Sequence, residues 1–320
     1  MEITSKHLKS KQGRKQLFRY WVRDPVFGVT SFALHYFMRF IPMRLNAWLG
    51  ANIGKLAFKT LLKTKAERVR HNLAILKPDL SPQEVDALLD AMWANIGQSM
   101  CEYSILDKLW DKGRVHVNDH DAIDYITSGK PFIFTGVHLG NWEAQASYVH
   151  AKKIPLMAMY KPPRSRFSRK IADISRNRMD ILTVPTDAQA MRKMYRHLES
   201  NGAIWLPIDD FKHNQVHFPR FGRPVATKGI NASHIVRMAL RFNAAIVPVQ
   251  ITRTNNPPPS FDVHVHRPMF LQDNSEASIA AFLESIDKLV EGWIMQHPEQ
   301  WFMMHELRLT APVDWNPTRH

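Results

Sequence analysis

Apolar residues cluster in two stretches near the start of the chain. The first runs from Val26 to Ile41 and is interrupted by His35 and Arg39, so it is shorter than the roughly 20 residues of a clean membrane span. The second continues to Leu62, and these basic residues flank the two stretches: Arg19, Arg23, Arg39, Arg44, Lys55 and Lys59. The pattern predicts two aromatic-rich helices that lie in, or dip into, a membrane interface. Burial of both helices against the remainder of the protein is the alternative.

Beyond residue 65, short apolar runs alternate with longer amphipathic stretches. The apolar runs are predicted as buried strands at 132–137, 154–160, 180–184, 203–208, 244–252 and 261–267. Helices are predicted at 66–76, 82–106, 120–128, 143–152, 165–178, 187–200 and 229–242. This alternation is typical of an α/β fold, and we expect a central mixed, mostly parallel sheet flanked by helices. We also expect two parts: residues 1–62 as a basic N-terminus with membrane-anchoring helices, and residues 63–320 as a catalytic domain.

Composition and charge narrow the class of protein. A chain of 320 residues with 45% hydrophobic residues can bury a large core, which excludes a largely disordered protein. A formal charge of +14 makes phosphates, anionic lipids and acidic proteins suitable partners. The single cysteine, Cys101, excludes an intramolecular disulfide and a CxxC metal site. The N-terminal residues are basic and polar, so no cleavable signal peptide is expected.

Polar side chains follow directly after the predicted strand at 132–137. His138, Asn141 and Glu143 belong to the segment HLGNWE, at the edge where open α/β sheets bind ligands. Residues five positions apart lie on different faces of a helix, so we expect His138 on the turn, Asn141 as the helix cap and Glu143 in the first helical turn. One imidazole nitrogen can then meet the carboxylate while the other faces a substrate, which suits acyl transfer to a hydroxyl. Otherwise Glu143 merely complements the helix dipole and His138 is an ordinary turn residue.

A second polar cluster follows the predicted strand at 203–208. Its members are Asp209, Asp210, His213 and His217, and carboxylates and imidazoles at such spacing are common metal ligands. We expect no metal here, because the acyl transfer suggested by the first cluster needs none.

Several segments resemble one family in the same order along the chain. HLGNWE resembles the His-x4-Asp/Glu motif of the glycerolipid acyltransferase superfamily, in the Glu-bearing form typical of the bacterial lipid A late acyltransferases. Further elements of that family are similar to RVRHNL at 68–73, YKP at 160–162, PIDD at 207–210, FGRPVAT at 221–227 and PEQW at 298–301. The sequence departs from the family pattern at Lys161 in place of Arg, at Ile208 and Asp209 in place of Asp-Gln, and at Trp301 in place of Tyr. These departures bear on the donor chain and the acceptor more than on the chemistry.

The resemblance implies a specific reaction. His138 is expected to deprotonate a hydroxyl of a lipid A precursor, whose oxygen attacks the thioester of an acyl-acyl carrier protein, while Glu143 holds the imidazole. The family places an oxyanion-stabilising arginine in the cationic segment 164–178, and Arg176 or Arg178 is favoured. A solvated helix face, or a docking surface for carrier protein or lipid phosphates, is the alternative for these cations. Oxyanion or substrate binding is expected of Asn141, Arg164, Arg176, Arg178, Asp209 and Asp210.

The same resemblance implies the partners and the location. Acyl carrier protein, a lipid A precursor of the Kdo2-lipid IVA type and inner-membrane lipids are expected, with no cofactor, no nucleic acid and no covalent acyl-enzyme. The catalytic domain is expected on the cytoplasmic side of the bacterial inner membrane. An acyltransferase for glycerophosphate or lysophospholipid is the alternative within this class. From other classes, a basic nucleic-acid-binding protein is disfavoured because the aromatics lie in apolar runs, and a non-catalytic scaffold because His138 and Glu143 are intact.

Overall fold

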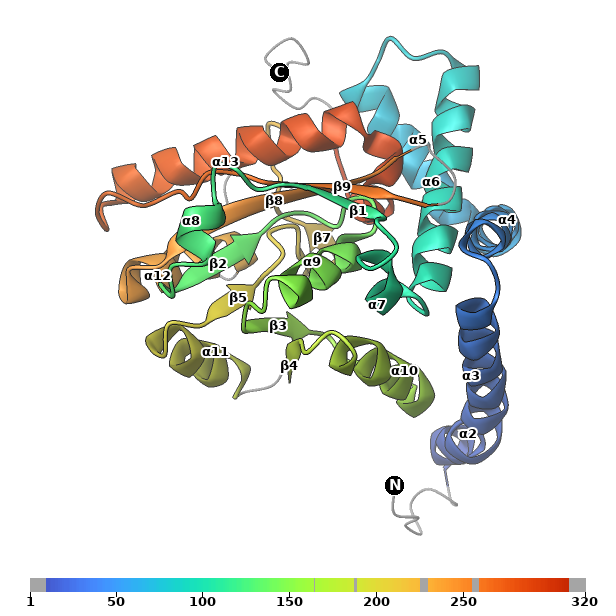
Figure 1. Ribbon diagram of the computed structural model, residues 1–320. Helices are drawn as coiled ribbons and strands as arrows, with labels where there is room; N and C mark the ends of the chain where they lie inside the picture. Colours follow the sequence, from blue (N-terminus) through green and yellow to red (C-terminus); the bar gives the residue numbers. More distant parts are fainter. Residues whose placement is uncertain (1–9, 164, 187–188, 225–229, 255–258, 311–320) are drawn as a thin grey trace.

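The computed structural model describes residues 10–163, 165–186, 189–224, 230–254 and 259–310. A twisted central sheet carries helices on both faces, and the N-terminal helices form an arm at one side of it (Figure 1).

The central sheet has seven strands in the order β1-β9-β8-β2-β5-β3-β4. Their bounds are β1 Val115–Asn118, β2 Phe132–Thr135, β3 Leu156–Tyr160, β4 Leu182–Pro185, β5 Ala203–Trp205, β8 Ala245–Arg253 and β9 Phe261–Val265. Every neighbouring pair is parallel except β8 and β9, which are antiparallel. The expected mixed, mostly parallel sheet is therefore confirmed. Strand β1, and a small hairpin of β6 (Phe211–Lys212) and β7 (Gln215–Val216), were not predicted, because so few residues give no readable apolar pattern.

The central strands separate two apolar cores. In β2, Ile133 packs into one core, whereas Phe132 and Phe134 pack into the other, as the alternation of strand side chains requires. The first face is covered by α11 (Ala190–Glu199), α12 (Asn231–Phe242) and α13 (Glu276–Gln296). The second is covered by α7 (Leu106–Leu109), α8 (Ile123–Ile126) and α9 (Gln145–Ala151). All of β2 is buried, as expected of a parallel strand covered on both sides.

The predicted helices are present, with changed ends. Helix α5 spans Lys63–Leu76, α6 spans Pro82–Glu102 and α10 spans Arg166–Asn177. The helix predicted at 82–106 ends earlier because the chain turns into α7, and the one predicted at 120–128 is reduced to α8. Helix α13 was missed, although Ser275 caps it and its buried residues Ile286, Val290 and Ile294 recur every fourth position.

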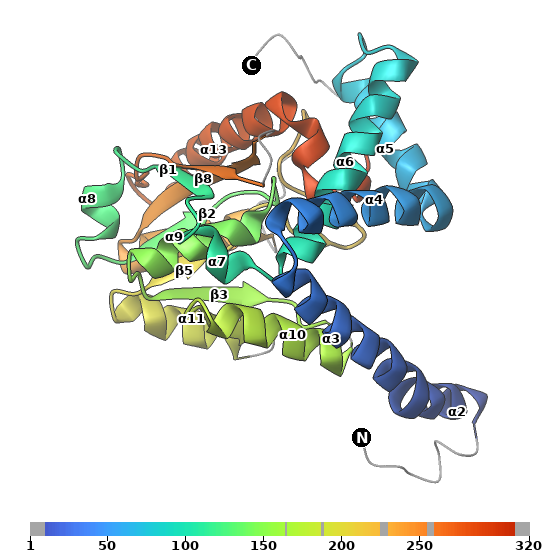
Figure 2. The same ribbon diagram turned by 45° about the vertical axis from the view of Figure 1, so that its right-hand side comes forward.

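The N-terminal arm consists of α2 (Lys11–Phe18), the π-helical segment η1 (Arg19–Arg23), α3 (Asp24–Phe40) and α4 (Met43–Leu61) (Figure 2). The two helices predicted near the start of the chain are thus present. Among the residues described, no helix is both long and apolar enough to cross a membrane. Large apolar side chains are nevertheless exposed along the arm: Phe18, Trp21, Val22, Val26, Phe27, Val29, Phe37, Phe40, Trp48, Ile53, Leu56 and Leu61.

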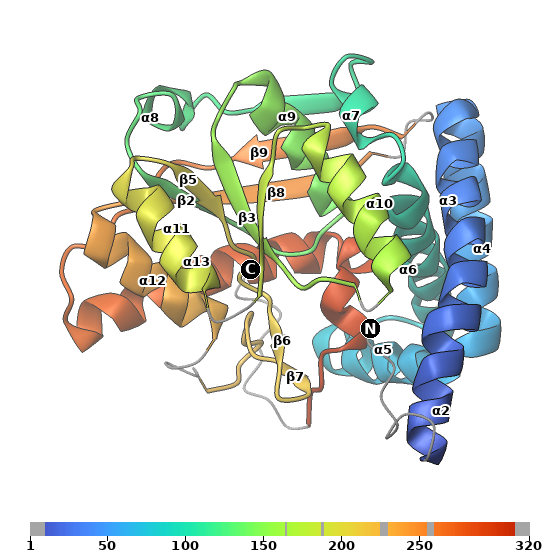
Figure 3. The same cartoon turned by 90° about the horizontal axis from the view of Figure 1, so that it is seen from below.

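Glycines join the arm to the rest of the protein. Helix α3 lies alongside α10, and α4 lies alongside α6 (Figure 3). The ring of Phe167 occupies the space that a side chain at Gly28 would need. A Cβ atom at Gly97 in α6 would overlap the carbonyl oxygen of Gly50 in α4. The backbones of α4 and α6 are therefore in direct contact, which only glycine permits.

Candidate active site

His138 lies on the turn that follows β2, at the carboxyl edge of the sheet. The parallel pairing of β2 and β5 continues past both strands, since the amide of Ile208 donates to the carbonyl of Gly136 at 2.9 Å. This register brings Asp209 against His138, although 71 residues separate them in the sequence. Polar residues from two adjacent strand ends therefore meet where open α/β sheets bind ligands.

Asp209 is the hydrogen-bond partner of the His138 imidazole. The Nδ1 atom of His138 lies 2.7 Å from Oδ1 of Asp209. The main-chain amide of His138 and the indole nitrogen of Trp301 both donate to Oδ2, each at 2.9 Å. These contacts satisfy a carboxylate that is fully buried. A carboxylate beside Nδ1 holds the proton on that nitrogen and leaves the lone pair of Nε2 free for a substrate.

The environment raises the pKa of His138 above its ordinary value. Burial lowers this pKa, but the negative charge of Asp209 and its hydrogen bond outweigh that effect. The carboxylates of Glu143 and Asp210 raise it further through their charges alone. The imidazole is nevertheless 20% exposed, so a substrate can reach it.

Aromatic side chains fix the plane of the imidazole. The ring of Trp142 stands edge-on to it, with centroids 4.9 Å apart, and the ring of Phe302 lies at 6.4 Å. The amide of Phe302 donates to the carbonyl of His138 at 2.8 Å, and Leu139 forms a β-bridge with Trp301. The carboxyl-terminal segment therefore holds the turn at His138 from one side.

Glu143 pairs with Arg176 and not with His138. Its Oε1 atom lies 2.8 Å from Nη2 of Arg176, and both side chains are largely buried. The guanidinium also lies over the ring of Tyr160, 4.8 Å from its centroid. Burial lowers the pKa of Arg176, but the charge and hydrogen bond of Glu143, together with Tyr103 and Tyr160, raise this pKa by more, so the guanidinium stays charged. Its Nη1 atom is buried without a hydrogen-bond partner among the described residues.

The hydrogen bond expected between Glu143 and the imidazole is therefore made by Asp209. The places from which the two carboxylates approach explain the difference. Asp209 reaches Nδ1 directly from the end of β5, whereas the short 3-10 helix after Asn141 turns Glu143 towards α10. Asp209 thus pairs with the imidazole of His138, and Glu143 pairs with the guanidinium of Arg176.

Asn141 caps the short helix, as predicted. Its Oδ1 atom accepts from the amide of Glu143 at 3.3 Å, and its Nδ2 atom donates to Glu102 at 2.9 Å. The side chain is 1% exposed and both ends of its amide group are engaged. In this structure Asn141 faces the protein interior and not the space beside His138.

The remaining predicted residues are more dispersed. Asp210 is buried, with one carboxylate oxygen 3.3 Å from the amide of Asn231 and the other 3.1 Å from Nζ of Lys212. Arg178 lies near His35 and Asp107, since its charge lowers the pKa of both groups. Arg164 lies outside the described residues.

Three of the four residues considered as metal ligands, Asp209, Asp210 and His217, have polar partners outside the cluster. Asp209 is occupied by His138 and Trp301, and Nε2 of His217 lies 3.1 Å from the carbonyl of Lys212. The rings of His213 and His217 are 6.3 Å apart, edge to face. Asp209 and His217 are therefore hydrogen-bonded within the protein.

Three residues that hold the site were not predicted to belong to it. Trp301 and Phe302 follow the PEQ segment, whose family resemblance was the only available signal. Glu102 belongs to no recognised motif, and its contact with Asn141 joins residues 39 positions apart.

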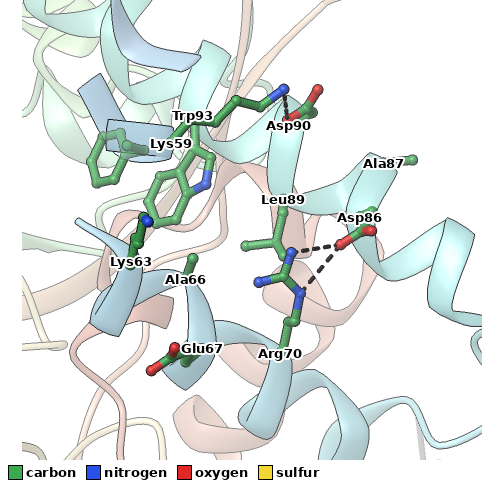
Figure 4. Close-up of a pocket in the computed structure, with 11 residues that line it drawn as sticks. Lys59, Lys63, Ala66, Glu67, Arg70, Asp86, Ala87, Leu89, Asp90 and Trp93 are labelled. Carbon is green, nitrogen blue, oxygen red and sulfur yellow. Dashed lines mark hydrogen bonds and ion pairs between the residues drawn. The ribbon is translucent and has the colours of Figure 1, made fainter. Parts of the chain in front are cut away.

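A groove of about 520 Å³ lies elsewhere, between α4, α5 and α6 (Figure 4). Its floor includes Phe58 and Trp93, whose rings stack 3.7 Å apart. Its rim carries the exposed Arg70–Asp86 pair, with atoms 2.7 Å apart. None of the predicted site residues lines this groove, so it is separate from the candidate active site.

Comparison with known proteins gives the family. The sequence profile described as "Bacterial lipid A biosynthesis acyltransferase" matches residues 14–310. A lipid A biosynthesis acyltransferase of Haemophilus influenzae is 26% identical over 282 residues, which cover 85% of this chain and 84% of that protein. The lipid A biosynthesis palmitoleoyltransferase of Escherichia coli is 22% identical, covering 85% and 88%. The lauroyltransferase of the same organism is 22% identical, covering 92% and 93%.

A solved structure shows a distant similarity. The 1-acyl-sn-glycerophosphate acyltransferase of Thermotoga maritima aligns with 76% of this chain and 96% of its own, at 11% identity and a TM-score of 0.37. This TM-score is too low to support a conclusion about the fold or the substrate.

Proposed function

The chain belongs to the family of bacterial lipid A biosynthesis acyltransferases, and we propose that it transfers a fatty acyl chain from acyl-acyl carrier protein to a hydroxyl of a lipid A precursor. The observation that carries the proposal is the His138–Asp209 pair at the carboxyl edge of the sheet, with Arg176 held nearby by Glu143. Membership of an enzyme family also argues against the nucleic-acid-binding and scaffold alternatives.

His138 acts as the general base. Its Nε2 atom removes the proton of the acceptor hydroxyl, and the oxygen attacks the thioester carbonyl carbon. When the tetrahedral intermediate collapses, the carbon–sulfur bond breaks and the imidazolium returns the proton to the thiolate. The new ester forms without a covalent acyl-enzyme. Asp209 stabilises the transient imidazolium and keeps the ring oriented, the role that the sequence assigned to Glu143.

Arg176 stabilises the oxyanion. Of the two arginines favoured from the sequence, it is the one bonded to Glu143, whereas Arg178 lies near His35 and Asp107. Nη1 is buried without a hydrogen-bond partner among the described residues in both arginines, so the contact with Glu143 is what favours Arg176, whose Nη1 can donate to a developing negative charge. Glu143 then acts by holding Arg176. Arg164 remains a predicted substrate-binding residue, and Asp210 contributes its charge to the pKa of His138.

The arm attaches the enzyme to the inner membrane. Residues 1–62 would form the membrane-binding part and residues 63–320 the catalytic domain, on the cytoplasmic side. Exposed aromatic side chains next to arginines and lysines, as at Phe18, Trp21 and Phe40, support binding within the interface of an anionic bilayer. The exposed cations of α10, Arg166 and Lys170 among them, suit an acidic carrier protein.

Mass spectrometry of the product tests the proposal. A purified underacylated lipid A precursor is incubated with the enzyme and a panel of acyl-acyl carrier proteins, and lysophospholipid is offered in parallel. A mass gain of one acyl group on the lipid A precursor is expected. Acylation of lysophospholipid alone would favour the glycerolipid alternative, and acylation of neither acceptor would contradict the proposal.

A further inference from the structure

A buried ion pair lies behind the catalytic turn. Glu102 at the end of α6 and Arg253 at the end of β8 form a two-point contact, with N–O distances of 2.5 and 2.8 Å. Glu102 is fully buried, and the Arg253 side chain is 10% exposed. Burying both charges is costly unless every oxygen and N–H group is engaged. The other hydrogen bonds of Glu102 and Arg253 show which part of the protein the pair holds in place.

Several of these contacts end on the turn between His138 and Glu143. Nδ2 of Asn141 donates to Oε2 of Glu102 at 2.9 Å. The hydroxyl of Ser99 donates to the carbonyl of Gly140 at 3.2 Å and accepts from Nη2 of Arg253 at 3.1 Å. The turn is therefore bonded to the ion pair both directly and through one hydroxyl.

The backbone around Gly140 is closely packed and hydrogen-bonded. Gly140 has a φ of +58°, and a Cβ atom there would lie 2.8 Å from the carbonyl oxygen of Ile251. Its amide donates to the carbonyl of Gln300 at 3.0 Å. The side chain of Gln300 in turn accepts from the amide of Arg253 at 2.7 Å and donates to its carbonyl at 3.1 Å. The turn is thus bonded on both sides.

The orientation of the Asn141 side-chain amide links the Glu102–Arg253 pair to Glu143 and Arg176. Because Glu102 accepts only from Nδ2, the Oδ1 atom must point to the amide of Glu143. Glu143 then holds Arg176. Without Glu102 the Asn141 amide is free to rotate by half a turn, which would point a donor at the donor of Glu143.

We infer that Glu102 and Arg253 are positioning residues for acyl transfer, which set the Asn141 amide and through it the Glu143–Arg176 pair. Neither residue touches the substrate. The inference rests on the proposed function for its kinetic consequence, while its structural consequence can be measured independently.

An exchange of the charged and the amide side chain between positions 102 and 141 distinguishes a positioning role from a purely structural one. The single variant Glu102→Gln removes the negative charge and one hydrogen-bond acceptor. The single variant Asn141→Asp places a second carboxylate against Glu102. In the double variant Glu102→Gln/Asn141→Asp, the new amide donates to the new carboxylate, whose other oxygen still accepts from Glu143. The net charge of the cluster is unchanged, so Arg253 keeps a counter-charge.

The experiment measures kcat and KM per folded enzyme, with lipid A precursor and acyl-acyl carrier protein. Glu102→Gln is expected to lower kcat at least about tenfold, with KM for the acceptor within about twofold of wild type. Asn141→Asp should be slower still. The kcat of the double variant should exceed that of Asn141→Asp at least about threefold. If the two substitutions acted independently, the double variant would instead be the slowest of the three, which would contradict the inference. Tyr148→Phe is the control, since it removes a partly buried 2.8 Å hydrogen bond to Asp119 away from the turn and should affect melting without affecting kcat.

A lower melting temperature of Glu102→Gln with unchanged kcat would overturn the inference and leave the proposed function intact. If the wild-type enzyme transfers no acyl group, the proposed function fails instead, and amide hydrogen exchange decides the inference. The amide of Glu143 should then exchange at least about tenfold faster in Glu102→Gln and recover in the double variant. Equal exchange in all three proteins would overturn the inference.

Discussion

Asp209 and His138 are joined by a 2.7 Å hydrogen bond between Oδ1 and Nδ1, and the same carboxylate accepts the main-chain amide of His138. The imidazole is thereby fixed from the end of the neighbouring strand. Glu143 is left to pair with Arg176 at 2.8 Å. Two carboxylates near one histidine thus have separate partners, the imidazole of His138 and the guanidinium of Arg176.

Removal of the base should abolish acyl transfer. His138→Ala is expected to retain less than about a tenth of the wild-type rate, because a positioned base typically contributes 10²- to 10⁴-fold. Folding should survive, since Asp209 keeps its bond from Trp301. Rates come from mass spectrometry of the lipid product, with circular dichroism as the folding control. A rate above that limit would exclude His138 as the base.

Glu143 and Arg176 should behave as one unit. Arg176→Ala is expected to lower kcat by about 10²- to 10³-fold, as for loss of an oxyanion donor. Glu143→Gln should be less severe, since Arg176 stays charged and is only less well held. The double variant should be no slower than Arg176→Ala, because the effects of coupled residues are not additive. Fully additive losses would contradict the assignment of Glu143 to Arg176.

The acid side of the pH–rate profile should reflect the raised pKa of His138. Only the neutral imidazole accepts a proton, so kcat/KM falls as the pH drops through this pKa. Because the pKa of His138 is raised, the midpoint should lie above the ordinary value of about 6.5. The measurement is kcat/KM across the pH range at constant ionic strength. A midpoint below that value would disagree with the environment described for the ring.

The glycine contact between α4 and α6 should be intolerant of side chains. Gly97→Ala places a methyl group on the carbonyl oxygen of Gly50, so the helices must separate, at a cost of about 1–3 kcal/mol. Gly292→Ala in α13 is the matched control, because no atom lies within 4 Å of its Cβ position and alanine favours helix by up to about 1 kcal/mol. Thermal melting should therefore fall for the first variant and stay level or rise for the second. Equal melting temperatures would contradict the direct contact.

The exposed aromatic side chains of the arm should bind lipid. Phe27 and Phe40 are 65% and 80% exposed, and replacing both by Asp should weaken vesicle flotation without changing turnover of detergent-dispersed substrate. Phe270→Asp is the control, since Phe270 is 53% exposed but lies after β9, far along the chain from the arm. Unaltered flotation of the double variant would contradict membrane attachment through the arm.

Local features of the site could be predicted from the sequence. The strand before His138 and the cap at Asn141 lie within about ten residues of one another, and both have strong local signals, an apolar run and an Asx cap. The polar residues after this strand pointed to His138 as a candidate base, and the resemblance to a family supplied the arginine segment. These predictions needed no knowledge of the order of strands in the sheet.

The partners of these residues could not be predicted in the same way. The contact of Asp209 with His138 depends on β5 lying next to β2, and sequence periodicity does not give strand order. Arg176 and Arg178 are two positions apart at the end of α10, where the direction of each side chain depends on the packing of α10 against α3. The Glu102–Arg253 pair joins α6 to β8 across 151 residues and carries no motif.

The most direct test is the pH dependence of kcat/KM for Asp209→Asn beside the wild-type enzyme. Loss of the negative charge removes the main influence that raises the pKa of His138. The account predicts a maximal rate at least about 10²-fold lower and an acid midpoint shifted to lower pH. A variant that keeps the wild-type rate and the wild-type midpoint would contradict the pairing of Asp209 with the catalytic base.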